Sequence, residues 1–153
     1  MGKQSAGILL YRINDNQLQM FLVHPGGPFF KNKDDGSWSI PKGEFDEPEN
    51  PLDAAKREFL EETGQSISGN FIELAAIQQK GGKIVKAWAV EGDIDHETIV
   101  SNTFEIEWPP RSGKKQAFPE IDRAAWFDIE TARMKINTAQ AGLINELVLK
   151  SSF

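Results

Sequence analysis

The sequence predicts a single α/β domain that spans residues 1–153, with β-strands interleaved with two helices. β-Prone runs separated by short turn-forming segments predict the strands, and apolar residues at helical spacing predict the helices. No internal repeat, linker or low-complexity tract divides the chain. A chain of 153 residues, 39% of them hydrophobic, is large enough to form one hydrophobic core.

In the first part of the chain, residues 6–13 and 17–24 form two β-prone runs around the turn-forming tripeptide NDN, which predicts a hairpin. Glycine, proline and charged residues then interrupt regular structure over residues 25–44, except for a possible short strand at 38–40. Two Phe and one Trp in this long loop argue against disorder, and long loops in compact domains are often functional.

Both predicted helices are amphipathic. The first covers residues 51–63, because Asn50 is a suitable N-cap, Pro51 suits the first helical position and Gly64 suits the C-terminal stop. The second lies near the C-terminus, within residues 138–150, where apolar side chains gather close to one face.

Further strands are predicted between the two helices. Residues 71–79 and 83–92, joined through KGG, read as a second strand pair. After residues 104–108 (FEIEW) and a loop over 109–120, residues 121–127 are predicted to form one more short strand or ordered segment.

Composition excludes several classes of function. Lys and Arg total 17 against 23 Asp and Glu, so a formal charge of −6 disfavours bulk binding of nucleic acid, and any phosphate ligand must meet local positive charge. The absence of cysteine excludes disulfides, thiolate metal sites and a cysteine nucleophile. The apolar run near the N-terminus is too short to span a membrane, so we expect a cytoplasmic protein with no membrane partner.

Three carboxylates crowd one face of the first helix. Glu58, Glu61 and Glu62 fall within an arc of roughly 100°, beside the apolar stripe. Each neighbouring like-charged pair costs about 0.2–0.5 kcal/mol, and negative charge near a helix C-terminus opposes the helix dipole. A solvated face with an Arg57–Glu61 pair is one interpretation. A site for a hard divalent cation is the other, since Mg²⁺ and Mn²⁺ prefer oxygen ligands.

Residues upstream of the helix favour the metal site. The segment GEFDEPENPLDAAKREFLEETGQ resembles the Nudix box, G-x5-E-x7-R-E-U-x-E-E-x-G-U, where U is a bulky aliphatic residue. All charged and glycine positions match: Gly43, Glu49, Arg57, Glu58, Glu61, Glu62 and Gly64. Phe59 supplies a bulky apolar residue, whereas Gln65 stands where the pattern has a hydrophobic one, and Ile67 is a candidate to replace that contact.

This resemblance to the Nudix family implies an α/β/α sandwich with a mixed β-sheet. It also implies a hydrolase that uses Mg²⁺ or Mn²⁺ to cleave a nucleoside diphosphate linked to another group. By position, the Gly43 carbonyl, Glu58 and Glu62 would hold metal, and Glu61 would hold metal or help to activate water. Arg57 would orient the glutamates, and Glu49 would support the loop.

Candidate catalytic and phosphate-binding residues also lie outside the motif. Family members often use a further glutamate from a variable loop, and Glu120 is the best candidate for the base or an extra ligand, with Glu105 and Glu107 as rivals. Lys42 precedes the motif glycine directly. The loop WPPRSGKKQ carries Arg111, Lys114 and Lys115, which suit the outer phosphates of a long substrate, although a plain solvated loop is equally consistent.

Aromatic side chains are the candidates for base recognition. Trp38 is the leading one, with Phe29, Phe30 and Trp108 as alternatives, although aromatic residues are more often core or loop anchors. His24 ends a predicted strand and is expected to be structural.

The sequence ranks substrates poorly. The run WSIPKGE resembles hydrolases of diadenosine tetraphosphate and other dinucleoside polyphosphates, and equally RNA 5′-pyrophosphohydrolases. We expect cleavage of a dinucleoside polyphosphate or a nucleoside triphosphate, with an RNA 5′-pyrophosphohydrolase as the alternative. A non-catalytic nucleotide-binding module, such as a sensor of ADP-ribose, is a further alternative, although such modules usually lose motif glutamates. The substrate, the number of metal ions and the oligomeric state are left open.

Overall fold

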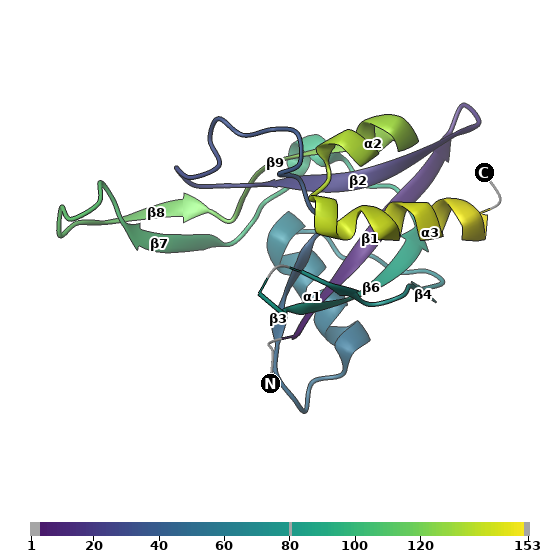
Figure 1. The fold of residues 1–153 in the computed structure, drawn as a ribbon, viewed down its shortest axis with the longest axis horizontal. Helices are drawn as coiled ribbons and strands as arrows, with labels where there is room; N and C mark the ends of the chain where they lie inside the picture. The colour runs from purple at the N-terminus through teal and green to yellow at the C-terminus, as the bar shows by residue number, and fades with distance from the viewer. Residues whose placement is uncertain (1–3, 80, 152–153) are drawn as a thin grey trace.

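A mixed β-sheet forms the centre of the molecule (Figure 1). The computed structural model describes residues 4–79 and 81–151. The strands of the sheet are β1 (Gln4–Asn14), β2 (Gln17–Pro25), β3 (Lys42–Phe45), β4 (Ile72–Glu73), β5 (Ile77–Gln78), β6 (Ile84–Glu91) and β9 (Ile121–Asp128). Their order is β4-β6-β1-β2-β9, with β3 paired to β1 and β5 paired to β6. β1 runs parallel to β6 and antiparallel to β2 and β3, so the sheet is mixed.

Helices cover both faces of this sheet. On one face, α1 (Pro51–Thr63) buries Ala55 and Phe59 in a cluster with Ile8 of β1. On the other face, α2 (Ile129–Lys135) and α3 (Ala141–Ser151) pack with Leu9 of β1. Consecutive side chains of a strand point to opposite faces, so one β1 strand supplies both cores. The predicted α/β/α sandwich is confirmed.

The first hairpin and the first helix are confirmed. Asp15 and Asn16 form the two-residue turn with φ of 52° and 61°, a left-handed backbone that these two residue types tolerate. In α1, the Asn50 side chain accepts hydrogen bonds from the backbone N–H groups of residues 52 and 53. Gly64 ends the helix in the left-handed conformation, with φ of 76°.

Other elements differ from the prediction because tertiary pairing overrides local composition. The end of the 25–44 loop is strand β3, which pairs its backbone with β1 despite its polar sequence. The strand predicted at 71–79 is broken into β4 and β5. The seven-residue α2 is too short to show a helical period, and the C-terminal helix is preceded by a 3₁₀ turn, η2 (Thr138–Gln140).

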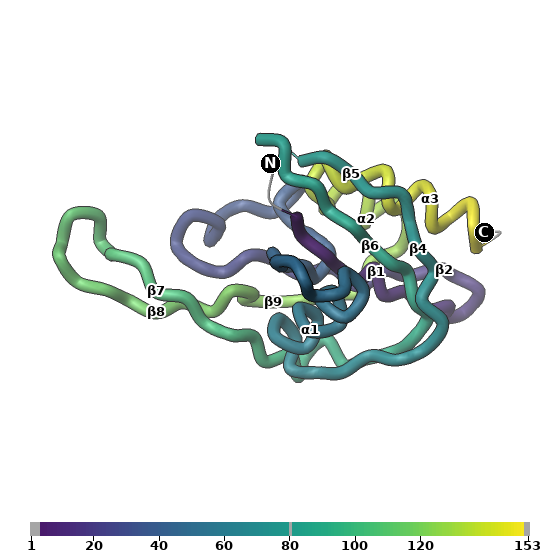
Figure 2. The backbone as a smooth tube through the Cα atoms, turned by 90° about the horizontal axis from the view of Figure 1, so that it is seen from below, coloured from purple at the N-terminus to yellow at the C-terminus, as the bar shows by residue number. Residues whose placement is uncertain are grey.

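A second hairpin projects from the body of the molecule (Figure 2). It consists of β7 (Thr103–Glu107) and β8 (Lys115–Pro119), and it follows a 3₁₀ turn, η1 (His96–Thr98). The sequence predicts a loop over 109–120, but its second half is β8, whose pairing with β7 comes only from the fold. Within the described residues, no helix is long and apolar enough to cross a membrane.

Candidate active site

Strand β3 and helix α1 bring Gly43 and Glu58 into contact. A Cβ atom built on Gly43 would lie 2.0 Å from Oε2 of Glu58, so only glycine leaves room for this carboxylate. Glu58 is 8% exposed, which is unusual for a glutamate. The motif glycine therefore allows a carboxylate to lie against the backbone at the edge of the sheet.

Arg57 organises the acidic residues around it. Its Nε lies 2.8 Å from Oε2 of Glu49 and its Nη2 lies 2.9 Å from Oε1, a bidentate pair that ties α1 to the preceding loop. Its Nη1 donates to Glu58 at 2.9 Å and to Glu61 at 3.2 Å. The Arg57–Glu61 pair of the simple helix-face interpretation is thus present, but within a larger network that orients two further glutamates.

Burial and mutual repulsion raise the pKa of two helix carboxylates. Burial raises the pKa of Glu58, and the charge of Glu61 raises it further, while Arg57 opposes both effects. Burial and the charge of Glu58 raise the pKa of Glu62 to about 8, although Glu62 accepts a hydrogen bond from the backbone N–H of Lys42 at 3.3 Å. The positive charge of Arg57 and Lys42 does not fully offset burial and repulsion at these two carboxylates, and a bound cation would relieve both.

Glu120 joins this group from the base of the projecting hairpin. Its N–H donates to the Asn102 carbonyl at 2.8 Å, and the Asn102 N–H donates to the Glu61 carbonyl at 2.9 Å. Burial and the charge of Glu61 raise the pKa of Glu120, and Glu120 in turn raises the pKa of Glu58 and of Glu62.

The two rivals of Glu120 lie farther along the hairpin. Glu105 pairs with Ala117 in the strand register, and Glu107 accepts a hydrogen bond from the Arg111 N–H. Neither is among the charges that shift the pKa of the helix carboxylates in the described part of the chain. We call the four coupled carboxylates, Glu58, Glu61, Glu62 and Glu120, the carboxylate cluster.

The donor types of the carboxylate cluster fit a hard divalent cation. Carboxylate oxygens beside an open backbone at Gly43 are the ligands that Mg²⁺ and Mn²⁺ prefer. Among residues 4–79 and 81–151, however, no three His, Asp or Glu side chains have the arrangement of a complete metal site. Glu58 and Glu61 are instead bonded to Arg57, and Glu62 to a backbone amide.

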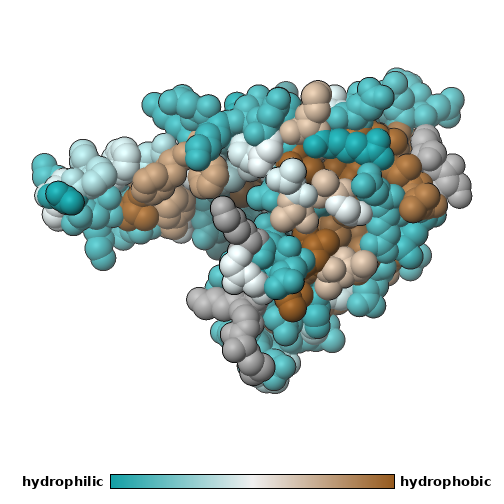
Figure 3. Space-filling view, viewed as in Figure 1, coloured by the Kyte–Doolittle hydropathy of each residue, from teal (hydrophilic) through white to brown (hydrophobic). Residues whose placement is uncertain are grey.

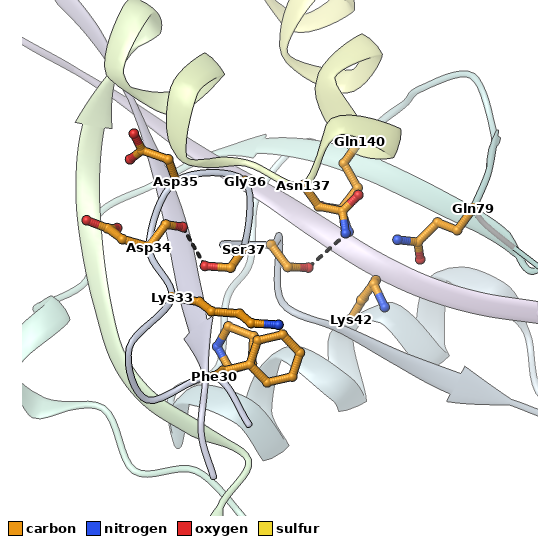
Figure 4. A pocket seen from close by; sticks show the side chains of 12 residues that line it. Phe30, Lys33, Asp34, Asp35, Gly36, Ser37, Lys42, Gln79, Asn137 and Gln140 are labelled. Carbon is orange, nitrogen blue, oxygen red and sulfur yellow. Dashed lines mark hydrogen bonds between the residues drawn. The ribbon is translucent and has the colours of Figure 1, made fainter. Parts of the chain in front are cut away.

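A cavity of about 460 Å³ opens beside Lys42, the residue that precedes Gly43 (Figure 4). Burial and the charge of Lys83 lower the pKa of Lys42, with nearby glutamates opposing the shift. Lys33 lies over the ring of Phe30 at 5.4 Å and extends toward Lys42. The remaining lining residues are Pro25, Asp34, Asp35, Gly36, Ser37, Ser39, Gln79, Asn137 and Gln140.

Within the described ranges, Lys33 and Lys42 are the two basic residues that line this cavity. Asp34 and Asp35 also line it, but Lys135 pairs with both of them, at 2.7 and 3.1 Å. The sequence interpretation missed Lys33, which nothing in the loop sequence distinguishes from an ordinary exposed lysine. It also missed Asn137 and Gln140, because the fold brings them to the loop from about 100 positions away, as in the Gln140–Ser39 hydrogen bond of 3.0 Å.

Trp38 lies in the core. It is 5% exposed and makes edge-to-face contacts with His24 and Phe127 at 5.2 and 5.0 Å. Its indole N–H donates to Asp34 at 2.8 Å, so the ring anchors the loop that lines the cavity. His24 is completely buried and bonded to Asp122 and to the Lys33 carbonyl, in agreement with a structural role.

The remaining predicted residues lie away from the carboxylate cluster. Arg111 and Lys114 are exposed in the turn between β7 and β8, at the far end of the hairpin from Glu120. At the end of α1, Gln65 bonds to Thr98 and to the Asp95 carbonyl, while Ile67 packs against the core. The departure from the motif at Gln65 is therefore compensated two residues later.

Comparisons with known proteins agree with this geometry. The NUDIX domain family matches residues 3–147. An RNA pyrophosphohydrolase of Bartonella henselae is 32% identical over 152 residues, with 84% of this chain and 78% of the relative covered. An RNA pyrophosphohydrolase of Bartonella tribocorum is 34% identical over 109 residues, with coverage of 61% and 58%.

Solved structures share the fold. A binary complex of an Ap4A hydrolase of C. elegans has a TM-score of 0.68 at 20% identity, with 97% of this chain and 99% of that chain covered. The NUDIX domain of Shewanella oneidensis NrtR, complexed with ADP ribose, has a TM-score of 0.68 at 16% identity and coverage of 98% and 88%. The family match over most of the chain and the relative at 32% identity establish membership of a family, and not only a shared fold. The chain belongs to the Nudix family, as a Nudix pyrophosphohydrolase.

Proposed function

We propose that this enzyme removes phosphates from the 5′ end of RNA, with Mg²⁺ or Mn²⁺ as cofactor. The observation that carries the proposal is the carboxylate cluster next to a cavity that presents Lys33 and Lys42. Acidic groups for a cation adjoin basic groups for phosphates, as hydrolysis of a phosphoanhydride requires. Relatives with 32% and 34% identity are named RNA pyrophosphohydrolases, which favours RNA over other nucleotides.

Each residue of the site has a proposed role. The Gly43 carbonyl, Glu58, Glu61 and Glu62 would hold the cation, which supplies charge neutralisation at the phosphates and a more acidic water. Arg57 keeps Glu58 and Glu61 oriented through its own pair with Glu49. Lys42 would bind a phosphate oxygen.

Glu120 is the proposed proton acceptor. Its raised pKa makes it a better base than an ordinary glutamate, and it stands at the edge of the cluster, outside the Arg57 network. Glu61, which the sequence leaves as the other candidate, has both of its carboxylate oxygens within hydrogen-bond distance of Arg57. Because Arg57 already engages both of these oxygens, we favour Glu120 over Glu61 as the proton acceptor.

A substrate panel tests the proposal. We expect kcat/KM with Mg²⁺ or Mn²⁺ to be highest for a 5′-triphosphorylated oligoribonucleotide, compared with diadenosine tetraphosphate, ATP and ADP-ribose. The same oligonucleotide with a 5′-hydroxyl group is the matched control and should release no phosphate. Preference for diadenosine tetraphosphate or ATP would contradict the assignment to RNA. Tight binding of a nucleotide without turnover, unchanged by Glu61→Gln, would instead indicate a binding module.

A further inference from the structure

The projecting hairpin is held in a fixed relation to the loop that lines the cavity. An isolated two-stranded hairpin is marginally stable in water, so β7 and β8 need support from elsewhere. Gly27 supplies close contact, because a Cβ built on it would lie 2.8 Å from the Phe104 ring. The Phe29 ring lies edge to face with Trp108, with a centroid distance of 5.7 Å. The loop therefore contacts the hairpin at Phe104 and at Trp108, while the turn of the hairpin extends beyond the loop (Figures 1 and 2).

The tip of the hairpin carries two exposed cations, although the Glu107 carboxylate lies at the same turn and accepts from the Arg111 N–H at 2.9 Å. Arg111 and Lys114 are exposed, and neither side chain forms an ion pair with any residue in the described ranges. Lys115 differs, since it lies opposite Glu107 in the strand register. Glu105 alternates with Phe104 along β7 and so points to the opposite face from the ring that contacts the loop. In a chain with net charge −6, these two cations are candidates to pair with an anionic ligand.

Exposed aromatic surface lies next to these cations. Phe29 is 62% exposed, although its ring is in contact with Trp108. The view of the surface shows apolar residues along the projecting hairpin and hydrophilic ones at its end (Figure 3). Aromatic rings beside a basic groove are typical of surfaces that bind single-stranded nucleic acid, where bases stack and phosphates pair with cations.

The hairpin leads directly away from the carboxylate cluster. Glu120 follows the last residue of β8, and the Gly26 N–H donates to its carbonyl at 2.8 Å. At about 3.4 Å per residue, the six steps from Glu120 back to Lys114 span roughly 20 Å. A phosphate group bound at the cluster does not reach this tip, whereas a chain of nucleotides attached to it extends along the hairpin.

We propose that Phe29, Trp108, Arg111 and Lys114, the hairpin surface, bind the single-stranded RNA that follows the 5′ polyphosphate. Bases stack on Phe29 and Trp108, and phosphates of the RNA backbone pair with Arg111 and Lys114. This inference rests on the proposed function and identifies where the enzyme distinguishes an RNA end from a free nucleotide.

Fluorescence anisotropy in EDTA measures the binding of a single-stranded oligoribonucleotide with a 5′-hydroxyl group. Without a 5′ polyphosphate or a metal ion, this binding reports on the hairpin surface and not on hydrolysis. Arg111→Asn with Lys114→Gln removes both charges, and asparagine tolerates the left-handed backbone of position 111, where φ is 65°. We expect the Kd to rise about tenfold at low salt. The logarithm of the association constant decreases with the logarithm of salt concentration, and the steepness of this decrease should be lower by about 0.7 for each lost phosphate contact.

The matched control removes the same charge elsewhere. The control variant combines Arg133→Gln on α2 with Lys150→Gln on α3, where both residues are exposed. It should leave the Kd and the salt dependence of binding unchanged. For stacking, Phe29→Ala should weaken binding several-fold, while Leu149→Ala, at a position 81% exposed, should not. Circular dichroism verifies that each variant is folded.

Two failures are distinguishable. An enzyme that hydrolyses 5′-triphosphorylated RNA, but whose RNA binding is unaltered by the hairpin variants or falls equally in the control, overturns this inference and leaves the proposed function standing. Loss of a concentration-dependent dimer in the hairpin variant, with RNA binding intact, also overturns it. A wild-type chain that hydrolyses no RNA overturns the proposed function.

Discussion

The segment from Gly43 to Gly64 and the hairpin surface are opposite in character. The first is acidic and partly buried, and contacts close in sequence hold it together: Arg57 bonds to Glu49, eight positions away, and to Glu61, four positions away. The second is basic, aromatic and exposed, and it depends on a contact between Phe29 and Trp108, which are far apart in the chain. The contrast suggests that the chemistry resides in a local motif, while the choice of substrate resides in a tertiary arrangement.

Electrostatics explain why the two regions are kept apart. In the carboxylate cluster, burial and like charges raise the pKa of Glu58, Glu62 and Glu120, so the region favours cations. At the hairpin tip, exposed cations are available to anions without the cost of burial. Under the proposed function, a polyphosphate attached to RNA would contact both regions, with metal cations between its phosphates and the cluster.

The largest effect is expected from Glu58→Gln, which tests the acidic region. The change should lower kcat by about 10³-fold, because a bound cation supplies several kcal/mol of charge stabilisation. The midpoint of thermal unfolding in EDTA should stay the same or rise, since an unfavourable buried charge is removed while the amide oxygen still accepts from Arg57. Glu97→Gln, at an exposed position in η1, is the control for both measurements. Strong unfolding would indicate that the cluster is structural.

A smaller loss is expected from Glu120→Gln, which tests the junction between the two regions. Without its proton acceptor, the enzyme should lose kcat by about 10²-fold. A base acts only when deprotonated, and its pKa is raised, so wild-type kcat should fall as the pH is lowered through that pKa. The variant should lack this acid limb. Glu105→Gln, on the outer part of the hairpin, should retain the wild-type profile, and a retained limb in Glu120→Gln would move the role to Glu61.

Gly43→Ala tests the contact between strand β3 and Glu58, and its expected effect is on stability. The added Cβ would meet Oε2 of Glu58 at 2.0 Å, so the carboxylate must move. Because Glu58 is buried and bonded to Arg57, we expect this movement to cost about 1 kcal/mol, at the low end for overpacking, in the free energy of unfolding. Gly142→Ala is the matched control, because nothing lies within 4 Å of a Cβ built there, in α3. It should be neutral or slightly stabilising. If chemical denaturation gives the same free energy of unfolding for both variants, the contact between Gly43 and Glu58 does not restrict position 43 to glycine.

Sequence reasoning succeeded where the signals were local. Asn50, Pro51 and Gly64 delimit α1 because capping and backbone conformation depend on adjacent residues. The seven motif residues pointed to the cluster because they lie within 22 positions, from strand β3 through the following loop to the end of α1. It failed for β3 and β8, whose polar residues become strands only by pairing with β1 and β7. It also favoured Trp38 for stacking, since burial of a loop residue leaves no mark in local composition.

The sequence by itself determined the α/β class, helix α1 and the family to which the chain belongs, because periodicity, caps and motif spacing are properties of neighbouring residues. Only the tertiary structure decided that Glu120 joins the helix glutamates, through backbone hydrogen bonds that link it by way of Asn102 to Glu61. Only the tertiary structure also placed Lys33 and Lys42 at one cavity and Phe29 against Trp108. These relations depend on strand pairing and packing between distant segments, which no local pattern of residues encodes.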